Sequence, residues 1–416
     1  MLADWAWFER FQWSDRDSIR RHRENKLRRL VTHAYGSVPY YRTLFDGAGV
    51  DPASIRTPED LPKIPVTAKK DLQAAGLEAT TSSTIRREEL LSETTSGSTG
   101  RPFTLRFDRR WKSLQRGLFL RALTTAGYRP GHRILMLTGP EDKRLPSWSG
   151  WRHVSFDTPP LIVLEEMERF RPHILYGWVT PLRALANRIA KSPKGGHAPR
   201  AVVTTAEGLD QATRHTLRSA FRAEVFDVYG LTEMGVVAWE CASHDGYHLA
   251  EDASIVEFLP LAAGGPEARL VMTNLELTAM PLIRYDAGDL GVAGPAEPCT
   301  CGRRFARLSR VDGRAVDCLR LHDGRIVSPY EITLALEGID GLDRYQVIQN
   351  RLDELMVRFE SSRPSDPTIA DAARRAVRSV VGERVSVDVR HEASLDPVAG
   401  RKFRVVDCRL PEDLTL

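Results

Sequence analysis

Long apolar runs and abundant cysteine are both absent from this 416-residue sequence, and its first residues do not predict a leader segment. No apolar run approaches the roughly 18 residues that a membrane-spanning helix needs. Residues 1–10 lack the basic start and apolar core of a secretion signal, and five cysteines are too few for a disulfide framework. Arginine is scattered and the net charge is only +4, so nucleic-acid binding is not indicated. We therefore expect a cytoplasmic protein that binds neither membranes nor nucleic acid.

The order of apolar and helical segments indicates an α/β protein with more than one domain. A chain of this length exceeds the size at which single cores stop growing. Strand-like runs at 133–138, 173–175, 201–205 and 225–229 alternate with helical segments at 161–169, 181–191 and 211–221. This alternation predicts a parallel or mixed sheet covered by helices. Further helices are predicted at 16–49, with a break at 38–41, and at 108–126.

The C-terminal part has a different pattern of predicted strands and helices, which indicates a separate domain. Strand-like runs at 344–350, 354–359 and 385–390 accompany a helix at 366–380. We predict a large N-terminal domain of mixed sheets flanked by helices, residues 1–313. A small C-terminal α+β domain would then comprise residues 314–416.

A glycine- and hydroxyl-rich loop lies between two strand-like patches, 90–91 and 103–107. Its central residues are Thr95, Ser96, Gly97, Ser98, Thr99 and Gly100. Glycines allow a tight turn, and hydroxyl and amide groups can surround an anion such as a phosphate. No lysine follows the second glycine, so this is not the nucleotide-binding Gly-x4-Gly-Lys-Ser/Thr loop. Taken alone, the segment fits an ordinary polar linker as well.

Three polar segments follow strand-like runs further along the chain. They are residues 203–208, with Glu207 and Gly208; residues 228–233, with Tyr229, Gly230, Thr232 and Glu233; and residues 283–289, with Asp289. Ligands of open α/β sheets collect at the carboxyl ends of strands. An aromatic face can stack on a nucleobase, a carboxylate beside phosphate oxygens can hold Mg²⁺, and an acidic side chain can accept hydrogen bonds from ribose hydroxyls. Each segment alone also fits a helix cap or a β-turn.

A fourth polar segment, residues 396–404, is a glycine loop that carries Lys402. A lysine can neutralise the negative charge that develops during attack on a phosphate. A solvated surface lysine is the ordinary alternative near a C-terminus.

The order of these segments resembles the adenylate-forming acid ligases and, within them, the phenylacetate–CoA ligase-like branch. The resemblance is carried by residues 95–100, 206–207, 229–233, 285–289 and 313–314, and residues 33–42 and 172–177 are similar to that branch too. It covers nearly the whole chain. It implies that MgATP activates a carboxylic acid as an acyl-adenylate with release of pyrophosphate, and that a thiol, most often coenzyme A, then takes the acyl group.

The resemblance also implies a role for each matching residue. Ser96 to Gly100 would hold the ATP phosphates with Thr232, while Glu207 and Tyr229 would border the adenine. Glu233 would bind Mg²⁺, and Asp289 would bind the ribose with Arg314. Lys402 would lie between the carboxylate oxygen and the α-phosphate during adenylation. Candidates for the acid pocket are Tyr176, Trp178 and Val203, and the aromatic ones suit a planar, aryl or aryl-acetic acid.

Two departures from the family pattern concern the C-terminal part. The acidic hinge residue that usually stands two places after the Gly-Arg pair is Val316 here, followed by Asp317. Domain rotation would then hinge differently. The final loop can also be aligned with Arg401 in the lysine's place, although the run Lys402-Phe403-Arg404 favours Lys402.

Cys241, His248, Cys299 and Cys301 are candidate ligands of a structural zinc ion. Two pairs of soft ligands brought together by strands would make a closed tetrahedral site. The Cys-x-Cys spacing is tighter than the usual one, and His244 competes with His248. The resemblance supports zinc, because several members of that branch carry a similar group. Buried thiols without metal are the alternative, and we interpret Cys318 and Cys408 as core cysteines.

The sequence leaves three alternatives to an acid–CoA ligase open. The same adenylation step could pass the acyl group to an amine. A degenerate member could bind nucleotide or acid without turnover. A zinc-organised interaction protein is the third, but it leaves the order of the motifs unexplained. Neither the acid nor the oligomeric state follows from the sequence, and a homodimer stays open.

Overall fold

The computed structural model describes residues 2–94, 103–139, 150–191, 197–261, 265–361, 363–364, 366–393, 395 and 404–411. Its contacts define two compact units. Unit 1 consists of Met1–His132, Phe226–Ala287 and Gly291–Val311, and unit 2 of Arg133–Val225, Gly288–Leu290 and Asp312–Leu416. The boundary that the sequence predicts between residues 313 and 314 stays a prediction.

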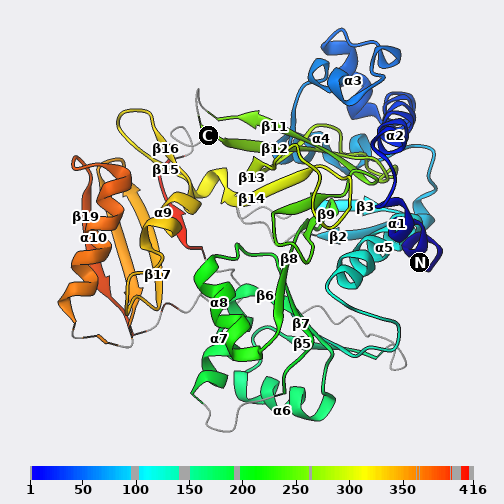
Figure 1. The fold of residues 1–416 in the computed structure, drawn as a ribbon. Helices are drawn as coiled ribbons and strands as arrows, with labels where there is room; N and C mark the ends of the chain where they lie inside the picture. The colour runs from blue at the N-terminus through cyan, green and yellow to red at the C-terminus, as the bar shows by residue number, and fades with distance from the viewer. Residues whose placement is uncertain are drawn as a thin grey trace. The chain divides into compact units, whose positions relative to one another are not determined.

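The helices and strands of unit 1 combine one large sheet with helices and a hairpin. The helices are α1 (Leu2–Phe11), α2 (Arg16–Ser37), α3 (Pro39–Gly47), α4 (Lys69–Thr80) and α5 (Arg109–Thr125). The strands, some of which extend a few residues into unit 2, are β1 (Thr67–Ala68), β2 (Leu91–Thr94), β3 (Thr104–Phe107), β8 (Glu224–Leu231), β9 (Gly235–Glu240), β10 (Tyr247–Leu249), β11 (Ser254–Pro260), β12 (Glu267–Asn274), β13 (Tyr285–Ala293) and β14 (Arg307–Arg314). The order in the sheet is β11-β12-β13-β14-β10-β9-β8 (Figure 1).

Strands β2 and β3 form a separate antiparallel hairpin, with Leu91 opposite Phe107 and Thr94 opposite Thr104. The two strand-like patches around the glycine loop are thereby confirmed as paired strands. Residues 95–102, between them, lie outside the described residues. The pairing of Thr94 with Thr104 fixes where that segment leaves and re-enters the sheet.

Helix α2 begins and ends for local reasons. The side chain of Asp15 accepts a hydrogen bond from the Ser18 amide at 2.8 Å, which caps the helix start. Its buried side is Ile19, Leu27, Leu30, Val31 and Ala34, and the last four of these pack in an apolar core of unit 1. Extended Val38 ends the helix, because Pro39 disfavours helical backbone in the residue before it. The break predicted at 38–41 is therefore confirmed at Val38, although Pro39 already begins α3.

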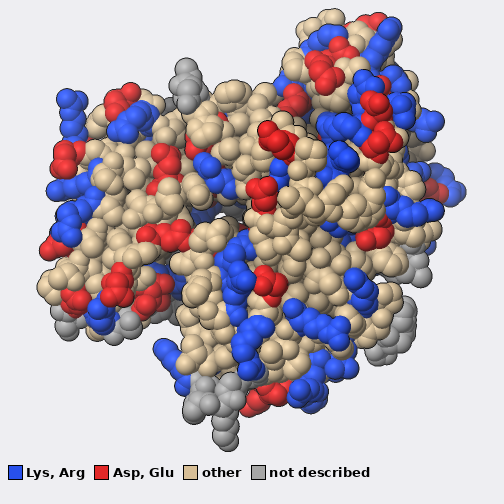
Figure 2. Space-filling model, viewed as in Figure 1, with Lys and Arg blue, Asp and Glu red and all other residues tan. Residues whose placement is uncertain are grey.

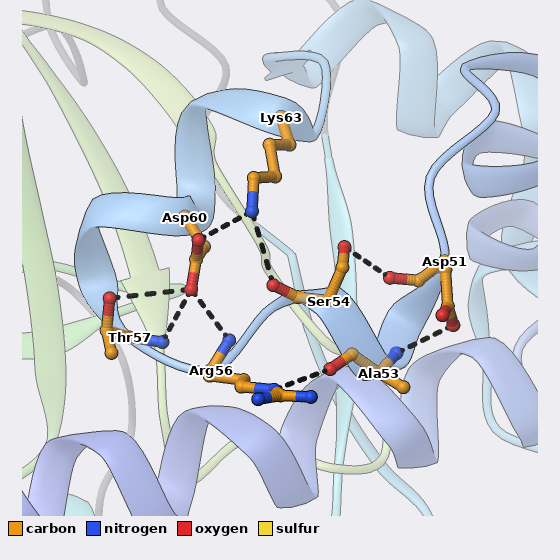
Figure 3. Close-up of polar contacts among 7 residues, drawn as sticks. All are labelled: Asp51, Ala53, Ser54, Arg56, Thr57, Asp60 and Lys63. Carbon is orange, nitrogen blue, oxygen red and sulfur yellow. Dashed lines mark hydrogen bonds and ion pairs between the residues drawn. The ribbon is translucent and has the colours of Figure 1, made fainter.

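The chain between α3 and α4 is held by Asp60 in a short 3₁₀-helix, Pro58–Lys63 (Figure 3). One carboxylate oxygen of Asp60 accepts the backbone N–H groups of Arg56 and Thr57, both at 3.0 Å. The other accepts the Lys63 ammonium at 2.6 Å, and that ammonium also donates to the Ser54 carbonyl at 3.3 Å. One partly exposed carboxylate thus organises the polar contacts of a connection whose Ile55, Leu61 and Ile64 side chains are buried in the unit 1 core.

Unit 2 contains the predicted α/β alternation. Its elements up to residue 225 are β4 (Ile134–Thr138), β5 (Trp151–Ser155), α6 (Pro160–Phe170), β6 (Ile174–Trp178), α7 (Val179–Ala190), β7 (Ala201–Thr205) and α8 (Gln211–Phe221). The strands are parallel in the order β5-β4-β6-β7, and α6, α7 and α8 pack on them through one apolar core. The alternation is confirmed, but β5 was not predicted because no residue of it is fully buried.

The C-terminal residues have a core of their own within unit 2. After a 3₁₀ turn (Ala315–Asp317), the elements are β15 (Leu319–Arg320), β16 (Ile326–Val327), α9 (Pro329–Leu336), β17 (Arg344–Arg351), β18 (Glu354–Glu360), α10 (Pro367–Val381), β19 (Ser386–His391) and β20 (Val406–Cys408). The sheet order is β19-β18-β17-β20, and α9 and α10 contribute to its apolar core (Figure 1). The expected fold, a large mixed α/β part with a small α+β part, is confirmed.

Charged side chains of both signs are interspersed over the face that Figure 2 shows. This agrees with a net charge of only +4. None of the helices in the described ranges combines the length and the apolar character needed to cross a bilayer.

Candidate active site and metal centre

Thr232 and Glu233 stand at the turn between β8 and β9 in unit 1. Glu233 is buried, and its carboxylate accepts a hydrogen bond from the Tyr285 hydroxyl at 2.9 Å. The carbonyl of Thr232 accepts a hydrogen bond from the Gln115 amide at 3.2 Å. The turn that the motif predicted is therefore held from two other elements, β13 and α5. Tyr285, whose hydroxyl donates this hydrogen bond, belongs to the predicted segment 283–289, but the sequence analysis assigned it no role.

The backbone of this turn requires glycine at position 230. A Cβ there would lie 2.7 Å from the Gly235 carbonyl oxygen, which no side chain tolerates. The strands shift register between Tyr229 and Gly230, a β-bulge of the kind that re-aims neighbouring side chains. Gly230 therefore sets the geometry of the turn that presents Glu233.

Glu207 follows β7 in unit 2, as predicted, but its carboxylate has a local partner. It accepts the backbone N–H of Thr180 at 2.7 Å, at the start of α7. Ala206 before it has a positive φ of 70°, an uncommon conformation for a residue with a side chain. Glu207 thus serves at least as a helix cap in this structure.

Aromatic side chains gather where β5 and β6 end in unit 2. Trp178 stacks on Phe156, with ring centroids 4.7 Å apart and planes 18° from parallel. A Cβ on Gly139 would touch the Trp178 ring at 3.5 Å. Tyr176 is partly exposed, whereas Val203 is completely buried inside the sheet. Phe156 was missed by the sequence analysis, since an isolated phenylalanine carries no recognisable pattern.

Asp289 and Arg314, both in unit 2, are brought together as predicted. The guanidinium Nε lies 3.6 Å from the Asp289 carboxylate. The carboxylate is nearly buried while the Arg314 side chain is 38% exposed. Gly313 before it has a φ of +100°, and a Cβ there would also meet Pro329 at 3.2 Å. Only glycine fits that position, which explains the Gly-Arg pair.

Asp317, which follows the altered hinge position, pairs with Arg404. Their side chains approach to 3.2 Å. Burial of the carboxyl group raises the pKa of Asp317 to about 6, against the opposing effect of Arg404. Residues 396–403, with Arg401 and Lys402, lie outside the described residues. For the segments that contain Ser96 and Lys402, the structure describes only the flanking residues, Thr94 and Phe103 for the first and Leu395 and Arg404 for the second.

The four candidate metal ligands are brought together in unit 1. Cys241 follows β9, His248 belongs to β10, and the chain between β13 and β14 supplies Cys299 and Cys301. Their donor atoms all lie within 4.8 Å of one another. His244, the competing candidate, lies instead with its Nδ1 3.6 Å from Glu240. His248, and not His244, therefore lies with the three cysteines as the fourth candidate ligand.

The spacing of the donor atoms fits a tetrahedral zinc site. The Cys241 and Cys299 sulfurs are 3.7 Å apart, and the Cys301 sulfur is 3.3 Å from His248 Nε2. Zinc bonds of about 2.3 Å to sulfur and about 2.0 Å to nitrogen imply edges of roughly 3.8 and 3.6 Å in a tetrahedron. A disulfide would need about 2.05 Å, so the thiols are not paired covalently.

The surroundings of the cluster also suit thiolate ligands. Burial, together with Arg303 and Arg307, lowers the pKa of His248 to about 4, so the imidazole is neutral at pH 7. Arg303 is buried and donates to the Cys301 sulfur at 3.5 Å. A guanidinium in that place compensates the negative charge of a metal-bound thiolate. Arg303 was missed by the sequence analysis, because its neighbour Arg304 looks equivalent there.

Comparisons with known proteins agree with the motif order. No family model matches the chain. The phenylacetate–coenzyme A ligase of Thermus thermophilus is 30% identical, over 95% of this chain and 97% of its own length. The phenylacetate–coenzyme A ligase of Escherichia coli is 28% identical, over 94% of this chain and 95% of its own.

Solved structures of acyl-CoA ligases share the fold. A 2-hydroxyisobutyryl-CoA ligase, in the postadenylation state and in complex with 2-HIB-AMP, has a TM-score of 0.78 at 23% identity, covering 93% of this chain and 89% of that one. A benzoate CoA ligase from Burkholderia xenovorans has a TM-score of 0.55 at 14% identity, covering 79% and 70%. Nearly the full length is shared with a relative at 30% identity, and the chain therefore belongs to the phenylacetate–coenzyme A ligase family.

Proposed function

We propose that this protein is an AMP-forming acid–thiol ligase. It would use ATP to convert a carboxylic acid into an acyl-adenylate and pyrophosphate, and would then transfer the acyl group to coenzyme A. The observation that carries the proposal is the likeness, over 95% of the chain, to a phenylacetate–coenzyme A ligase. The motifs of that reaction stand in order along the same chain.

The chemistry consists of two displacements. In the first, a carboxylate oxygen of the acid attacks the α-phosphorus of ATP, and the bond to the pyrophosphate oxygen breaks. In the second, the sulfur of coenzyme A attacks the acyl carbon, and AMP leaves with the former carboxylate oxygen. The mixed anhydride acylates readily because AMP is a good leaving group.

Particular side chains support each step in this proposal. Residues 95–100 and Thr232 would bind the phosphates, and Asp289 with Arg314 would hold the ribose. Glu233, fixed by the Tyr285 hydroxyl, would be the Mg²⁺ ligand, and that ion would neutralise phosphate charge. Lys402 would stabilise the charge that develops at the α-phosphate.

The adenine would lie beside Tyr229 and Glu207, with Gly208 and Gly230 adjacent to them in the sequence. Glu207 already caps α7, so its contribution would come through that fixed position. Residues 314–416 would rotate between the two steps, as mobile elements do in many enzymes. Asp317, rather than Val316, would be the acidic residue at that hinge.

The acid would be aromatic or aryl-acetic. The stacked pair of Trp178 and Phe156 offers a flat apolar surface at the carboxyl end of a parallel sheet, where ligands of such sheets bind. Tyr176 lies on the same strand, two residues earlier. Flat rings favour offset or edge contacts with other aromatic groups.

The test is a panel of acids with the purified protein. Acid-dependent exchange of labelled pyrophosphate into ATP would report the first step, and consumption of coenzyme A the second. We expect aryl and aryl-acetic acids to be the best substrates. Capture of the acyl group by hydroxylamine without any use of coenzyme A would point to an amide-forming ligase. Absence of exchange across the whole panel would contradict the proposal.

We also propose that Cys241, His248, Cys299 and Cys301 hold a structural Zn²⁺ ion. Four protein ligands leave no open coordination position, so the ion would hold strands together and would not act on the substrate. The support is the donor spacing and the buried Arg303 beside Cys301. The cytoplasmic location and a homodimer remain predictions from the sequence.

A further inference from the structure

Five arginines are buried in the part of the chain that the structure describes: Arg121, Arg284, Arg303, Arg307 and Arg320. Three of them form ion pairs with carboxylates, namely Arg121 with Asp252, Arg284 with Glu257, and Arg307 with Asp245. Arg303 donates to Cys301 of the metal cluster. Buried charges in proteins are normally paired, and the three ion pairs follow that rule; Arg303 has no carboxylate partner but donates to the side-chain oxygen of Gln12 at 2.7 Å as well as to Cys301.

Arg320 departs from this pattern. It is only 9% exposed, yet within the described residues no carboxylate lies within ion-pair distance of its guanidinium. Two of its nitrogens, Nε and Nη2, are buried and have no hydrogen-bond partner there; the same two nitrogens of Arg121 are unpartnered too, but Arg121 has Asp252 as its counter-charge. A guanidinium keeps its proton under ordinary conditions, so the charge cannot be removed by titration near pH 7. The buried guanidinium of Arg320 therefore lacks a negatively charged partner, which a bound anion would supply.

Strand pairing and two hydrogen bonds hold the backbone of Arg320 in place. Arg320 lies in β15, opposite Ile326 of β16. Its backbone N–H donates to the side-chain oxygen of Gln349 at 2.9 Å, and its carbonyl accepts the Gln349 side-chain amide at 2.7 Å. Gln349 is itself fully buried in β17. These two hydrogen bonds fix the backbone of Arg320 against β17.

The two thiols near Arg320 do not supply the missing negative charge. The Cys318 sulfur donates to the Arg314 carbonyl at 3.7 Å, and the Cys408 sulfur donates to the Gln349 side-chain oxygen at 3.6 Å. A thiol that donates its proton in this way is neutral. Burial agrees with this, since it raises the pKa of Cys318 to about 12 and raises the pKa of Cys408 as well.

We propose that Arg320 binds a phosphate group of a ligand. A planar guanidinium presents several N–H donors in a fork that matches a phosphate, and desolvation strengthens such a contact. The source of the phosphate rests on the proposed function, because ATP, pyrophosphate and coenzyme A all carry one. Pantetheine, the thiol arm of coenzyme A, carries none and separates these sources.

The decisive variant is Arg320→Met, which keeps an unbranched side chain of comparable length and removes the charge. The ligand-free variant should melt at a higher temperature than the wild type, because a buried unpaired charge is lost. It should also lose at least tenfold in affinity for a phosphate ligand. Arg325→Met is the matched control on the same hairpin, since Arg325 is exposed and pairs with Asp323; it should change neither quantity.

The binding probes are coenzyme A, pantetheine, pyrophosphate and inorganic phosphate, each measured by calorimetry and by the shift in melting temperature. Weaker binding of coenzyme A with unchanged binding of pantetheine would identify a coenzyme A phosphate. Weaker binding of pyrophosphate would identify the nucleotide side of the reaction. Arg320→Lys keeps the charge without the fork and should give an intermediate loss. If Arg320→Met does not fold, the affinities measured with Arg320→Lys test the proposal in its place.

Unchanged affinity for all four probes in Arg320→Met would overturn the proposal. So would a lower melting temperature in the ligand-free variant, since it would show that the charge is already paired. Failure of the proposed function is recognised separately, because wild-type protein would then show no acid-dependent pyrophosphate exchange. The binding measurements do not depend on turnover and would still decide the role of Arg320.

Discussion

The ion pair of Arg121 and Asp252 is completely withdrawn from solvent. The guanidinium lies 4.0 Å from the ring centroid of Trp239, with Phe8 and Phe305 also within 6 Å. The pair therefore occupies an apolar setting in which either charge alone would be strongly destabilising. It links α5 to the chain after β10, close to the metal cluster.

Asp252→Asn should destabilise the protein by about 3–5 kcal/mol, because it leaves a buried guanidinium without its counter-charge. The double variant Arg121→Met with Asp252→Asn should recover part of that loss. Urea unfolding of the wild type, the two single variants and the double variant gives the coupling energy between the residues. Additive losses would show that the two side chains do not stabilise each other.

Asp60 offers a prediction of the opposite kind, at a partly exposed position. The Lys63 ammonium and the backbone N–H groups of Arg56 and Thr57 lower the pKa of Asp60 below its ordinary value. Because the ionised form is the one that is bound, this stabilisation is present at neutral pH. It is lost as the pH falls through the lowered pKa of the folded protein.

Asp60→Asn should therefore lower the melting temperature at pH 7, and the difference from the wild type should shrink at the acidic end of the measurable range. Asp46→Asn is a suitable comparison for a carboxylate nearby that does not organise this connection. A difference between wild type and Asp60→Asn that grows on acidification would contradict the explanation.

At the scale of elements, the metal cluster joins β9, β10 and the chain between β13 and β14. Removal of zinc should lower the melting temperature by several degrees, because the binding energy of a structural ion contributes to folding. Cys301→Ser should reduce the zinc content below one ion per chain. Cys408→Ser, outside the cluster, should keep it. Protein that contains no zinc, and whose melting temperature does not respond to added zinc, would contradict the proposed site.

The β8–β9 turn allows a backbone test of the proposed magnesium ligand. Gly230→Ala places a methyl group against the Gly235 carbonyl and must displace the turn that carries Glu233. We expect a loss of about 1–3 kcal/mol in stability and a fall of at least tenfold in pyrophosphate exchange. In α2, a Cβ at Gly36 would meet nothing within 4 Å, so Gly36→Ala should be neutral or slightly stabilising. Full activity in Gly230→Ala would show that the turn has no part in adenylation.

At the scale of the whole molecule, the two half-reactions should respond differently to the lysine of the final loop. Lys402→Ala should slow acid-dependent pyrophosphate exchange by a factor of about 100 or more, because charge at the α-phosphate loses its partner. Formation of thioester from supplied acyl-adenylate and coenzyme A should stay within about threefold of the wild type. The two rates are measured separately on the same preparation.

Arg401→Ala is the matched neighbour, and it should leave both rates within about threefold. If Arg401→Ala were the variant that stops adenylation, the alternative alignment of the loop would be correct. If both half-reactions fell together in Lys402→Ala, the lysine would act on the fold or on a shared step, and not on adenylation alone.

The sequence by itself determined the local structure and the order of the motifs. Helix α8 has the predicted bounds, since Asp210 caps its start and an apolar side faces the core. Short elements were less predictable, and α9, with eight residues, was missed because it holds too few turns for a periodic pattern. The N-terminal helix α1 was missed as well, since its aromatic residues show no clear apolar side. Cys408, expected in the core, is only half-buried, because it lies at the last position of a short strand.

Only the tertiary structure decided which side chains meet and which charges are buried. Tyr285 reaches Glu233 across 52 positions, and the choice of His248 over His244 depends on how β10 pairs with its neighbours. The same holds for arginine: the sequence treats Arg320 and Arg325 alike, whereas the fold buries one and exposes the other. Burial is set by packing among distant segments, and desolvation is what turns an ordinary charge into a binding group.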